Sequence, residues 1–343
     1  MEFRKASEIQ VGVIGYGGAF NMGKAHINEM KQAGMTPCAV CEIDKERLQA
    51  ATADFPGIET YSSVAAMLKR SSVNLITIIT PHNTHAKLAL QCLNAGRSVV
   101  CEKPLAITTT ECDAMLAAAR KKHVVLSTYH NRHWDGCILN ALKHQKSGTF
   151  GDIARISVQM GRQEKPGDWW RSSRSISGGI LYDWGVHLLE YAFQLMRHTE
   201  LVEVSGFARH GFWAESVHWK QDTIEDEAQA VVRFKNGAWL TLCITHLDAA
   251  PTPHWVKIVG TKATYSFDYR GFEIVRNDKA DSFLQKGVNP ESEHWRFYRN
   301  IADHLVKGEK LIITPEWSRR PIHVLDLAGQ SARQGRSLMV KYS

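Results

Sequence analysis

Asp183 and His187 are the residues whose types and spacing first suggest chemistry. They stand four positions apart in the segment Gly178–His198, in which a glycine pair precedes an amphipathic pattern from about Ile180 to Met196. Residues at this spacing share one face of a helix, so the carboxylate and the imidazole can meet there. Such a pair can act as a general acid and base. A surface Asp–His pair on an ordinary helix fits the same spacing.

The start of the chain predicts the unit that would hold a dinucleotide. A short apolar run at Gln10–Ile14 ends in a glycine-rich turn, followed by a helical stretch at about Met22–Ala33 and a second strand at Thr36–Cys41. Strand, glycine turn, helix and strand open a dinucleotide-binding βαβ fold. The glycines let the backbone approach a pyrophosphate, whose charge then lies at the N-terminus of the helix.

The glycine turn departs from the usual G-x-G-x-x-G spacing. Gly15 and Gly17 fit the first two positions, but Phe20 occupies the third and the next glycine is Gly23. We interpret this as a turn lengthened by three residues, with Gly23 at the close contact between helix and strand. The turn residues expected at the cofactor are Gly15, Gly17, Gly18, Ala19, Phe20, Asn21 and Met22.

An acidic residue, Glu42, follows the second strand, and Asp44 comes two positions later. A carboxylate at this place accepts hydrogen bonds from ribose hydroxyls and repels a 2′-phosphate, so Glu42 favours NAD over NADP. The alternative role, an acid at the N-terminus of a helix over Lys45–Phe55, fits Asp44 better than Glu42.

Strand-like and helix-like segments continue to alternate to about residue 128, which predicts a doubly wound parallel α/β sheet. Val73–Thr80 and Ser98–Cys101 are almost unbroken apolar runs, as expected of strands buried on both faces. Ligands bind at the carboxyl ends of the strands in such sheets. The further residues that this rule places at the cofactor are Thr80, Pro81, His82, His85, Glu102 and Lys103.

The second half of the chain has a different pattern. From Ile153 the strand-like segments no longer alternate with helices, and Asn236-Gly237 between two β-rich runs predicts a hairpin. We therefore predict a dinucleotide-binding domain over residues 1–128 and an α/β domain over residues 129–343 with a large, mostly antiparallel open sheet. A C-terminal helix packing back on the first domain is compatible with this division.

A run of aromatic and charged side chains, Asp168-Trp169-Trp170-Arg171, precedes the turn at Gly178. Indole faces pack against the C–H faces of sugars, while Arg and Asp bind hydroxyls. Ordinary core tryptophans beside a surface ion pair are an equal alternative. Other side chains that could reach a substrate are those of Arg132, Arg155, His130, His133 and His254.

Composition narrows the class of protein. The 343 residues suffice for two domains, and 44% hydrophobic and 22% charged residues are typical of a globular protein. The net charge of +7 is scattered, so we expect no nucleic-acid partner. Because no apolar run could span a bilayer and the start lacks a secretory segment, we expect no membrane partner and a cytoplasmic location.

Cysteine and histidine usage points to neither disulfides nor metal. Seven cysteines without a framework spacing fit reduced thiols, and Cys38 and Cys41 should point to opposite faces of one strand. None of the sixteen histidines forms an H-x₃-H or HExxH pattern on a helix, so we expect no metal site.

Taken together, GYGGAFNMGKAH, ITPHNTH, CEKPLA, DWWRSSRSISGG and YDWGVHLLE resemble the Gfo/Idh/MocA family of sugar and inositol oxidoreductases over nearly the whole chain. The resemblance implies an N-terminal Rossmann domain and a C-terminal domain whose open sheet supports a homodimer or homotetramer. It also implies that Lys103, Asp183 and His187 take the catalytic positions. The lengthened glycine turn is a departure from the family pattern, and membership alone does not define the substrate.

The chemistry can also be argued from the residues. Oxidation of a secondary alcohol needs a hydride acceptor, here NAD, and a base for the hydroxyl proton. The imidazole of His187 suits the base, since its ordinary pKa is about 6.5. Asp183 would orient the ring, and the ammonium of Lys103 would stabilise the developing alkoxide. For Lys103, a surface cation before a helix is the alternative.

These considerations lead to three hypotheses. The first is an NAD-dependent dehydrogenase acting on a secondary hydroxyl of a sugar, glycoside or inositol, with C3 of a glucoside as a candidate position. The second is an NAD-dependent glycoside hydrolase or lyase that oxidises its substrate transiently, eliminates and returns the hydride. The third is a catalytically silent protein that senses the cofactor.

Overall fold

The computed structural model describes residues 3–18, 20–278 and 281–341. The chain forms two compact units. The first consists of Met1–Asn131 and Trp295–Arg320, and the second of Arg132–His294 and Pro321–Ser343. The segment Trp295–Arg320 thus belongs to the first unit, whereas the division at residue 128 places it in the second domain.

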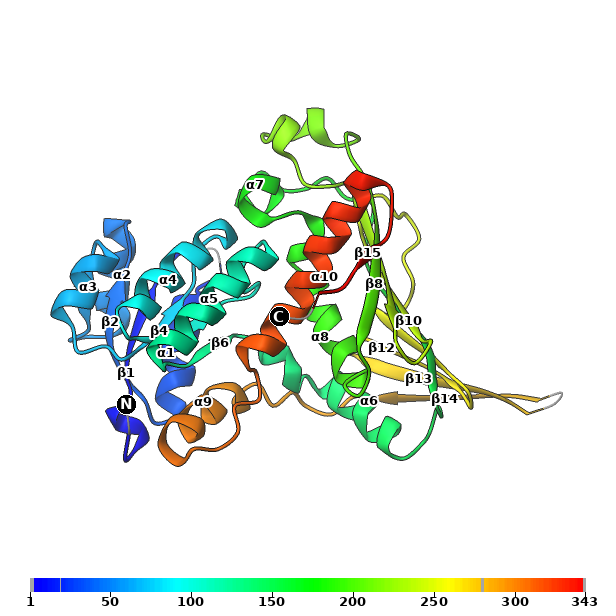
Figure 1. Cartoon of the computed structure of the whole chain (residues 1–343), viewed down its shortest axis with the longest axis horizontal. Helices are drawn as coiled ribbons and strands as arrows, with labels where there is room; N and C mark the ends of the chain where they lie inside the picture. The colour runs from blue at the N-terminus through cyan, green and yellow to red at the C-terminus, as the bar shows by residue number, and fades with distance from the viewer. Residues whose placement is uncertain (1–2, 19, 279–280, 342–343) are drawn as a thin grey trace. The chain divides into compact units, whose positions relative to one another are not determined.

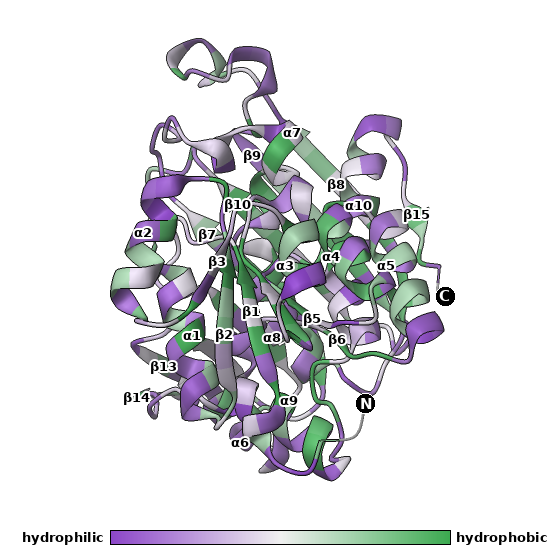
Figure 2. Ribbon diagram, turned by 90° about the vertical axis from the view of Figure 1, so that its left-hand side faces the viewer, coloured by the Kyte–Doolittle hydropathy of each residue, from purple (hydrophilic) through white to green (hydrophobic). Residues whose placement is uncertain are grey.

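The first unit contains a six-stranded parallel sheet in the order β3-β2-β1-β4-β5-β6. Helices α1 and α2 lie on one side of the strands and α3, α4 and α5 on the other (Figure 2). The predicted doubly wound sheet is therefore confirmed. The strands are β1 (Gln10–Ile14), β2 (Thr36–Cys41), β3 (Glu59–Tyr61), β4 (Leu75–Ile78), β5 (Ser98–Cys101) and β6 (Leu126–Thr128). The helices are α1 (Met22–Gln32), α2 (Lys45–Asp54), α3 (Val64–Arg70), α4 (His85–Asn94), α5 (Thr109–Lys122) and α9 (Arg296–Lys307).

Local signals explain where these helices begin and end. The side chain of Asp44 accepts hydrogen bonds from the backbone N–H groups of the first turn of α2, as expected of a helix-capping acid. Thr108 and Glu111 form a capping box at the start of α5. Gly96, with a φ of 73°, follows α4 and stops it.

The second unit contains a nine-stranded sheet in the order β14-β13-β12-β11-β7-β10-β9-β8-β15. Every neighbouring pair is antiparallel except β7 and β10, which confirms the mostly antiparallel sheet (Figure 1). Gly237, with a φ of 88°, lies in the turn between β9 and β10, where the hairpin was expected. The strands are β7 (Ile153–Gly161), β8 (Leu201–Arg209), β9 (Glu227–Phe234), β10 (Trp239–Thr245), β11 (Val256–Gly260), β12 (Thr264–Phe267), β13 (Gly271–Asp278), β14 (Asp281–Val288) and β15 (Leu338–Met339).

Helices cover one face of this sheet, and α8 (Gly185–Leu195) lies at the centre of the core. Every residue of α8 is buried, so the helix is enclosed rather than amphipathic at a surface. The predicted single helix from Ile180 is divided: a short 3₁₀ turn spans Ile180–Tyr182, and Asp183 precedes α8. The other helices are α6 (Gly136–Lys146), α7 (Arg174–Ser177) and α10 (Pro315–Gln334), whose first residues belong to the first unit.

In the part of the chain that the structure describes, no helix is both long and apolar enough to cross a membrane.

Candidate functional site

The glycine turn after β1 has the close packing that a dinucleotide site requires. Gly15 has a φ of +97°, and a Cβ there would lie 2.1 Å from the backbone oxygen of Ile79, so only glycine fits. At Gly23 a Cβ would lie 2.6 Å from the ring of Tyr16, so the close contact of this glycine is with the turn after β1 and not with the strand itself. Helix α1 begins at Met22, directly after the turn. Ala19, a predicted cofactor residue, lies outside the described residues.

We expect Gly15→Ala to weaken NADH binding at least tenfold and to lower the free energy of unfolding by about 1–3 kcal/mol, because the backbone would be strained and its neighbour displaced. Fluorescence titration with NADH and thermal unfolding would measure the two effects. Gly17→Ala is the control for stability, since a Cβ at Gly17 would meet nothing within 4 Å. Equal unfolding of both variants would contradict the prediction.

Glu42 connects the end of β2 to the glycine turn. Its Oε2 accepts the backbone N–H of Tyr16 at 2.7 Å, and its Oε1 accepts the N–H of Ile43 at 2.6 Å. Carboxylate oxygens have lone pairs for more than one donor, so ribose hydroxyls can still be accepted. A second charge, which the sequence prediction missed, lies nearby: a Cβ on Gly18 would lie 2.3 Å from the Arg47 guanidinium. The glycine turn is therefore flanked both by the Glu42 carboxylate, which repels anions, and by the Arg47 guanidinium, which attracts them.

Four of the predicted cofactor residues follow the carboxyl ends of neighbouring strands. Strands β2, β1, β4 and β5 are parallel neighbours, so the segments that leave their carboxyl ends come together. These segments carry Glu42, Gly15, Thr80 and Glu102. A turn with a helix N-terminus, a close-approach glycine and a carboxylate on the next strand fits a dinucleotide.

His85 has a role different from the predicted cofactor contact. It is fully buried, with Nδ1 lying 2.7 Å from the carbonyl oxygen of Pro104 and Nε2 lying 2.8 Å from that of Thr80. The ring therefore connects the turn after β4 with the segment after β5. We assign His85 to the support of these two turns. His82, another predicted contact, is also buried.

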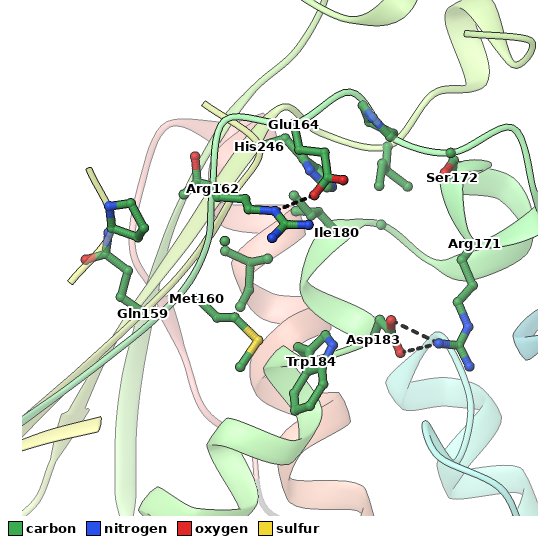
Figure 3. A pocket seen from close by; sticks show the side chains of 18 of the residues that line it. Gln159, Met160, Arg162, Glu164, Arg171, Ser172, Ile180, Asp183, Trp184 and His246 are labelled. Carbon is green, nitrogen blue, oxygen red and sulfur yellow. Dashed lines mark hydrogen bonds and ion pairs between the residues drawn. The ribbon is translucent and has the colours of Figure 1, made fainter. Parts of the chain in front are cut away.

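In the second unit, a pocket of about 530 Å³ lies where β7, β10 and the segment before α8 meet (Figure 3). Asp183 and Trp184 line it beside residues that the sequence prediction missed, including Arg162, His246 and Trp255. These residues lie at strand ends, and their convergence depends on strand pairing, so no local signal identifies them. Burial lowers the pKa of the His246 imidazole despite the nearby Glu164 carboxylate, which raises it.

Asp183 forms an ion pair with Arg171, a residue that was expected to bind substrate and not to contact Asp183. Nη1 of Arg171 donates to both carboxylate oxygens, at 3.0 and 3.1 Å, and Figure 3 shows the two side chains facing each other. The guanidinium lies 5.0 Å from the ring centroid of Trp169 and 5.3 Å from that of Trp170. The structure thus brings together four of the predicted site residues, namely Trp169, Trp170, Arg171 and Asp183.

His187 occupies the first turn of α8 and is 5% exposed. Its ring lies beside that of Trp184, with centroids 5.7 Å apart. The guanidinium of Arg132 also lies against Trp184, 4.7 Å from the centroid of its ring. The same guanidinium donates a hydrogen bond to the Asp135 carboxylate at 3.2 Å. Arg132, predicted to bind substrate, therefore supports a wall of the pocket.

Two further residues that were predicted to bind substrate, Asp168 and Arg155, are not among the residues that line the pocket. Asp168 accepts the backbone N–H of His218 at 2.7 Å, which anchors the segment between β8 and β9. Arg155 alternates on β7 with Ile156 and Val158, which are buried, so its side chain lies on the opposite face of the sheet and does not line the pocket.

The three other candidate histidines have acidic partners or buried positions. Nδ1 of His133 contacts the Glu190 carboxylate in the core, and Nδ1 of His254 lies 3.3 Å from Asp268. His130 is fully buried. None of the three is among the residues that line the pocket, and neither is His187.

Comparisons with known proteins agree with this architecture. Residues 9–130 match the family described as "Oxidoreductase family, NAD-binding Rossmann fold", and residues 138–266 match the "GFO/IDH/MocA C-terminal domain". The chain is 24% identical to scyllo-inositol 2-dehydrogenase (NADP(+)) IolW of Bacillus subtilis, over 99% of this chain and 98% of that protein. It is 28% identical to myo-inositol 2-dehydrogenase of Thermotoga maritima, over 67% and 66%. The structure of levoglucosan dehydrogenase with NADH and levoglucosan has the same fold, with a TM-score of 0.81, 20% identity and coverage of 98% and 100%.

Proposed function

Because the chain belongs to the Gfo/Idh/MocA family of oxidoreductases, we propose that it transfers a hydride between a secondary hydroxyl of a sugar, glycoside or inositol and NAD. It is a dehydrogenase that acts on CH–OH groups. The pocket beside Asp183, lined by indoles and charged side chains, is the observation that supports a polyol substrate. Its volume falls in the range of about 300–1,000 Å³ that is usual for small-molecule sites.

The proposed roles follow from charge and proton affinity. Bound NAD supplies the hydride acceptor. The imidazole of His187 takes the hydroxyl proton, and the ammonium of Lys103 stabilises the developing alkoxide. Asp183 orients the imidazole and stabilises its charged form. The ion pair with Arg171 fixes the carboxylate for this task, because it removes the freedom of the Asp183 side chain.

Turnover with a panel of polyols tests the proposal. The protein is incubated with NAD or NADP and with scyllo-inositol, myo-inositol, levoglucosan, glucose and aryl glucosides, while reduced cofactor is followed by its near-ultraviolet absorbance. We expect reduced cofactor with at least one member. A protein that binds NADH but reduces no cofactor with any member would contradict the proposal. Release of aglycone without reduced cofactor would support the glycoside-cleaving hypothesis.

The cofactor proposal is NAD, because the Glu42 carboxylate would repel a 2′-phosphate. We expect Glu42→Gln to lower the ratio of kcat/KM for NAD to that for NADP about tenfold, equivalent to about 1.4 kcal/mol, since glutamine keeps an acceptor for the Tyr16 N–H but loses the charge. Arg47→Met should change the same ratio in the opposite direction. An unchanged ratio in Glu42→Gln would contradict the assignment.

We also propose a homodimer or homotetramer formed through the open face of the nine-stranded sheet. Trp239 and Phe207 are 41% and 61% exposed on strands β10 and β8. Both alternate in sequence with residues that face the helices, so they lie on the uncovered face. Light scattering of the wild type and of Trp239→Lys would test this assignment.

A further inference from the structure

A buried chain of hydrogen bonds reaches the residue before Lys103 from three other elements of the first unit. His26, on α1, is fully buried. Its Nδ1 lies 2.6 Å from the hydroxyl of Tyr298 on α9, and its Nε2 lies 3.0 Å from Oε1 of Glu102. The Tyr298 hydroxyl lies 3.3 Å from that of Thr77 on β4. The other oxygen of Glu102 accepts the backbone N–H of Lys103 at 2.9 Å.

The direction of the central hydrogen bond follows from the chemistry of the groups. Burial raises the pKa of the Glu102 carboxyl, but the hydrogen bond and electrostatic interaction with His26 and the charge of Lys103 outweigh it, so this pKa lies below its ordinary value. An ionised carboxylate only accepts, and Nε2 of His26 must therefore carry a proton and donate it. Nδ1 then accepts from Tyr298 or, in the imidazolium, donates to it, and both arrangements satisfy the ring.

Aromatic rings hold the imidazole in this orientation. The ring of Tyr129 lies edge-on to that of His26 with centroids 4.2 Å apart, and the ring of Tyr298 lies at 5.8 Å. The Tyr129 hydroxyl donates to Glu29, which is also on α1, at 2.7 Å. Rotation of the imidazole would leave buried polar atoms without partners, so the contact with Glu102 is well determined.

We propose that His26, supported by Tyr298, is a positioning residue for Lys103. It holds the Glu102 carboxylate, and this carboxylate holds the backbone N–H from which the Lys103 side chain extends. The same helix begins at the glycine turn, so a single rigid element carries both the pyrophosphate end of the cofactor site and the group that fixes the lysine. The inference rests on the proposed function to the extent that Lys103 is catalytic.

His26→Leu and His26→Gln test the hydrogen bond separately from the packing. Leucine removes the donor, whereas the amide nitrogen of glutamine can extend about as far as Nε2 of histidine. We expect His26→Leu to lower kcat about 10²-fold, as a misplaced catalytic group does, with KM and the Kd for NADH nearly unchanged. His26→Gln should restore most of kcat, and Tyr298→Phe should be intermediate. His144→Leu, which removes a partly buried histidine of the second unit, is the control.

A second measurement does not depend on turnover. The rate at which an amine-reactive ester acetylates Lys103, quantified by mass spectrometry of its peptide, reports the surroundings of the ammonium. In His26→Leu, the buried Glu102 carboxyl loses the donor that holds its pKa low and carries less negative charge beside the ammonium, so Lys103 should react several-fold faster than in the wild type. The rate at the exposed Lys121 should not change.

The outcomes separate this inference from the proposed function. A wild type that turns over no polyol, with faster acetylation of Lys103 in His26→Leu, would contradict the function and keep the positioning role. Full kcat and unchanged acetylation in His26→Leu would overturn the inference alone. The inference is also overturned if glutamine fails to restore kcat and both variants show a raised KM, weaker NADH binding and lower thermal stability. His26 would then have only a structural role.

Discussion

Replacing Lys103 with methionine should lower kcat about 10²–10³-fold while NADH binds almost as tightly as in the wild type. The ammonium is proposed to stabilise negative charge that appears on the substrate oxygen only as the reaction proceeds, so its loss affects turnover more than binding. Methionine has a similar length and keeps the backbone N–H that Glu102 accepts. Steady-state kinetics with the best polyol and fluorescence titration with NADH would measure the two quantities.

Two further variants make this result specific. Lys121→Met, at the exposed end of α5, removes a lysine of the same unit and should leave kcat unchanged. Lys103→Arg keeps the charge but spreads it over a planar group, and we expect partial activity. Full kcat in Lys103→Met, or a loss of NADH binding as large as the loss of kcat, would contradict the role proposed for the ammonium.

The first unit could be predicted well from the sequence because its signals are local. Each strand, turn and helix is adjacent in sequence to the next, and parallel strands place their carboxyl ends at one edge of the sheet. Gly15, Glu42 and Lys103 could therefore be assigned to this edge without knowledge of long-range contacts. Gly23 was expected at the contact between helix and strand, and a Cβ there would lie 2.6 Å from the ring of Tyr16, in the turn that follows β1.

The contacts that could not be predicted join residues far apart in the chain. Helix α9 follows the second sheet in sequence, yet its Tyr298 contacts His26, 272 positions earlier. The pattern of α9 shows that it is amphipathic but does not indicate which unit it covers. Similarly, the pocket lining at His246 and Trp255 depends on how β10 and β11 pair with β7.

Sequence periodicity also failed to show a break in the helix between Asp183 and His187. Their spacing fits one continuous helix, but α8 begins only at Gly185, after a 3₁₀ turn. The apolar pattern continues through this break because both segments are buried, so periodicity could not reveal it. The ion pair of Asp183 with Arg171 depends on the course of the eleven residues between them.

Replacing His187 with asparagine should lower kcat about 10²–10⁴-fold and abolish the rise of kcat with pH. In the wild type the imidazole accepts the hydroxyl proton only when it is neutral, so the rate should fall as the pH falls through the imidazole pKa. Asparagine does not titrate in this range, and the remaining rate should lack this limb. Profiles of kcat against pH, with NADH titration as a check on cofactor binding, would measure both effects.

Asp183→Asn provides the matched comparison for this pH profile. Because the imidazole is retained, Asp183→Asn should lower kcat but keep a limb that rises with pH. The limb should also move to lower pH, since the carboxylate no longer stabilises the imidazolium. A His187→Asn variant that keeps the limb of the wild type would assign the titrating base to another residue. A limb that is unchanged in Asp183→Asn would mean that the carboxylate serves Arg171 and the substrate rather than the ring.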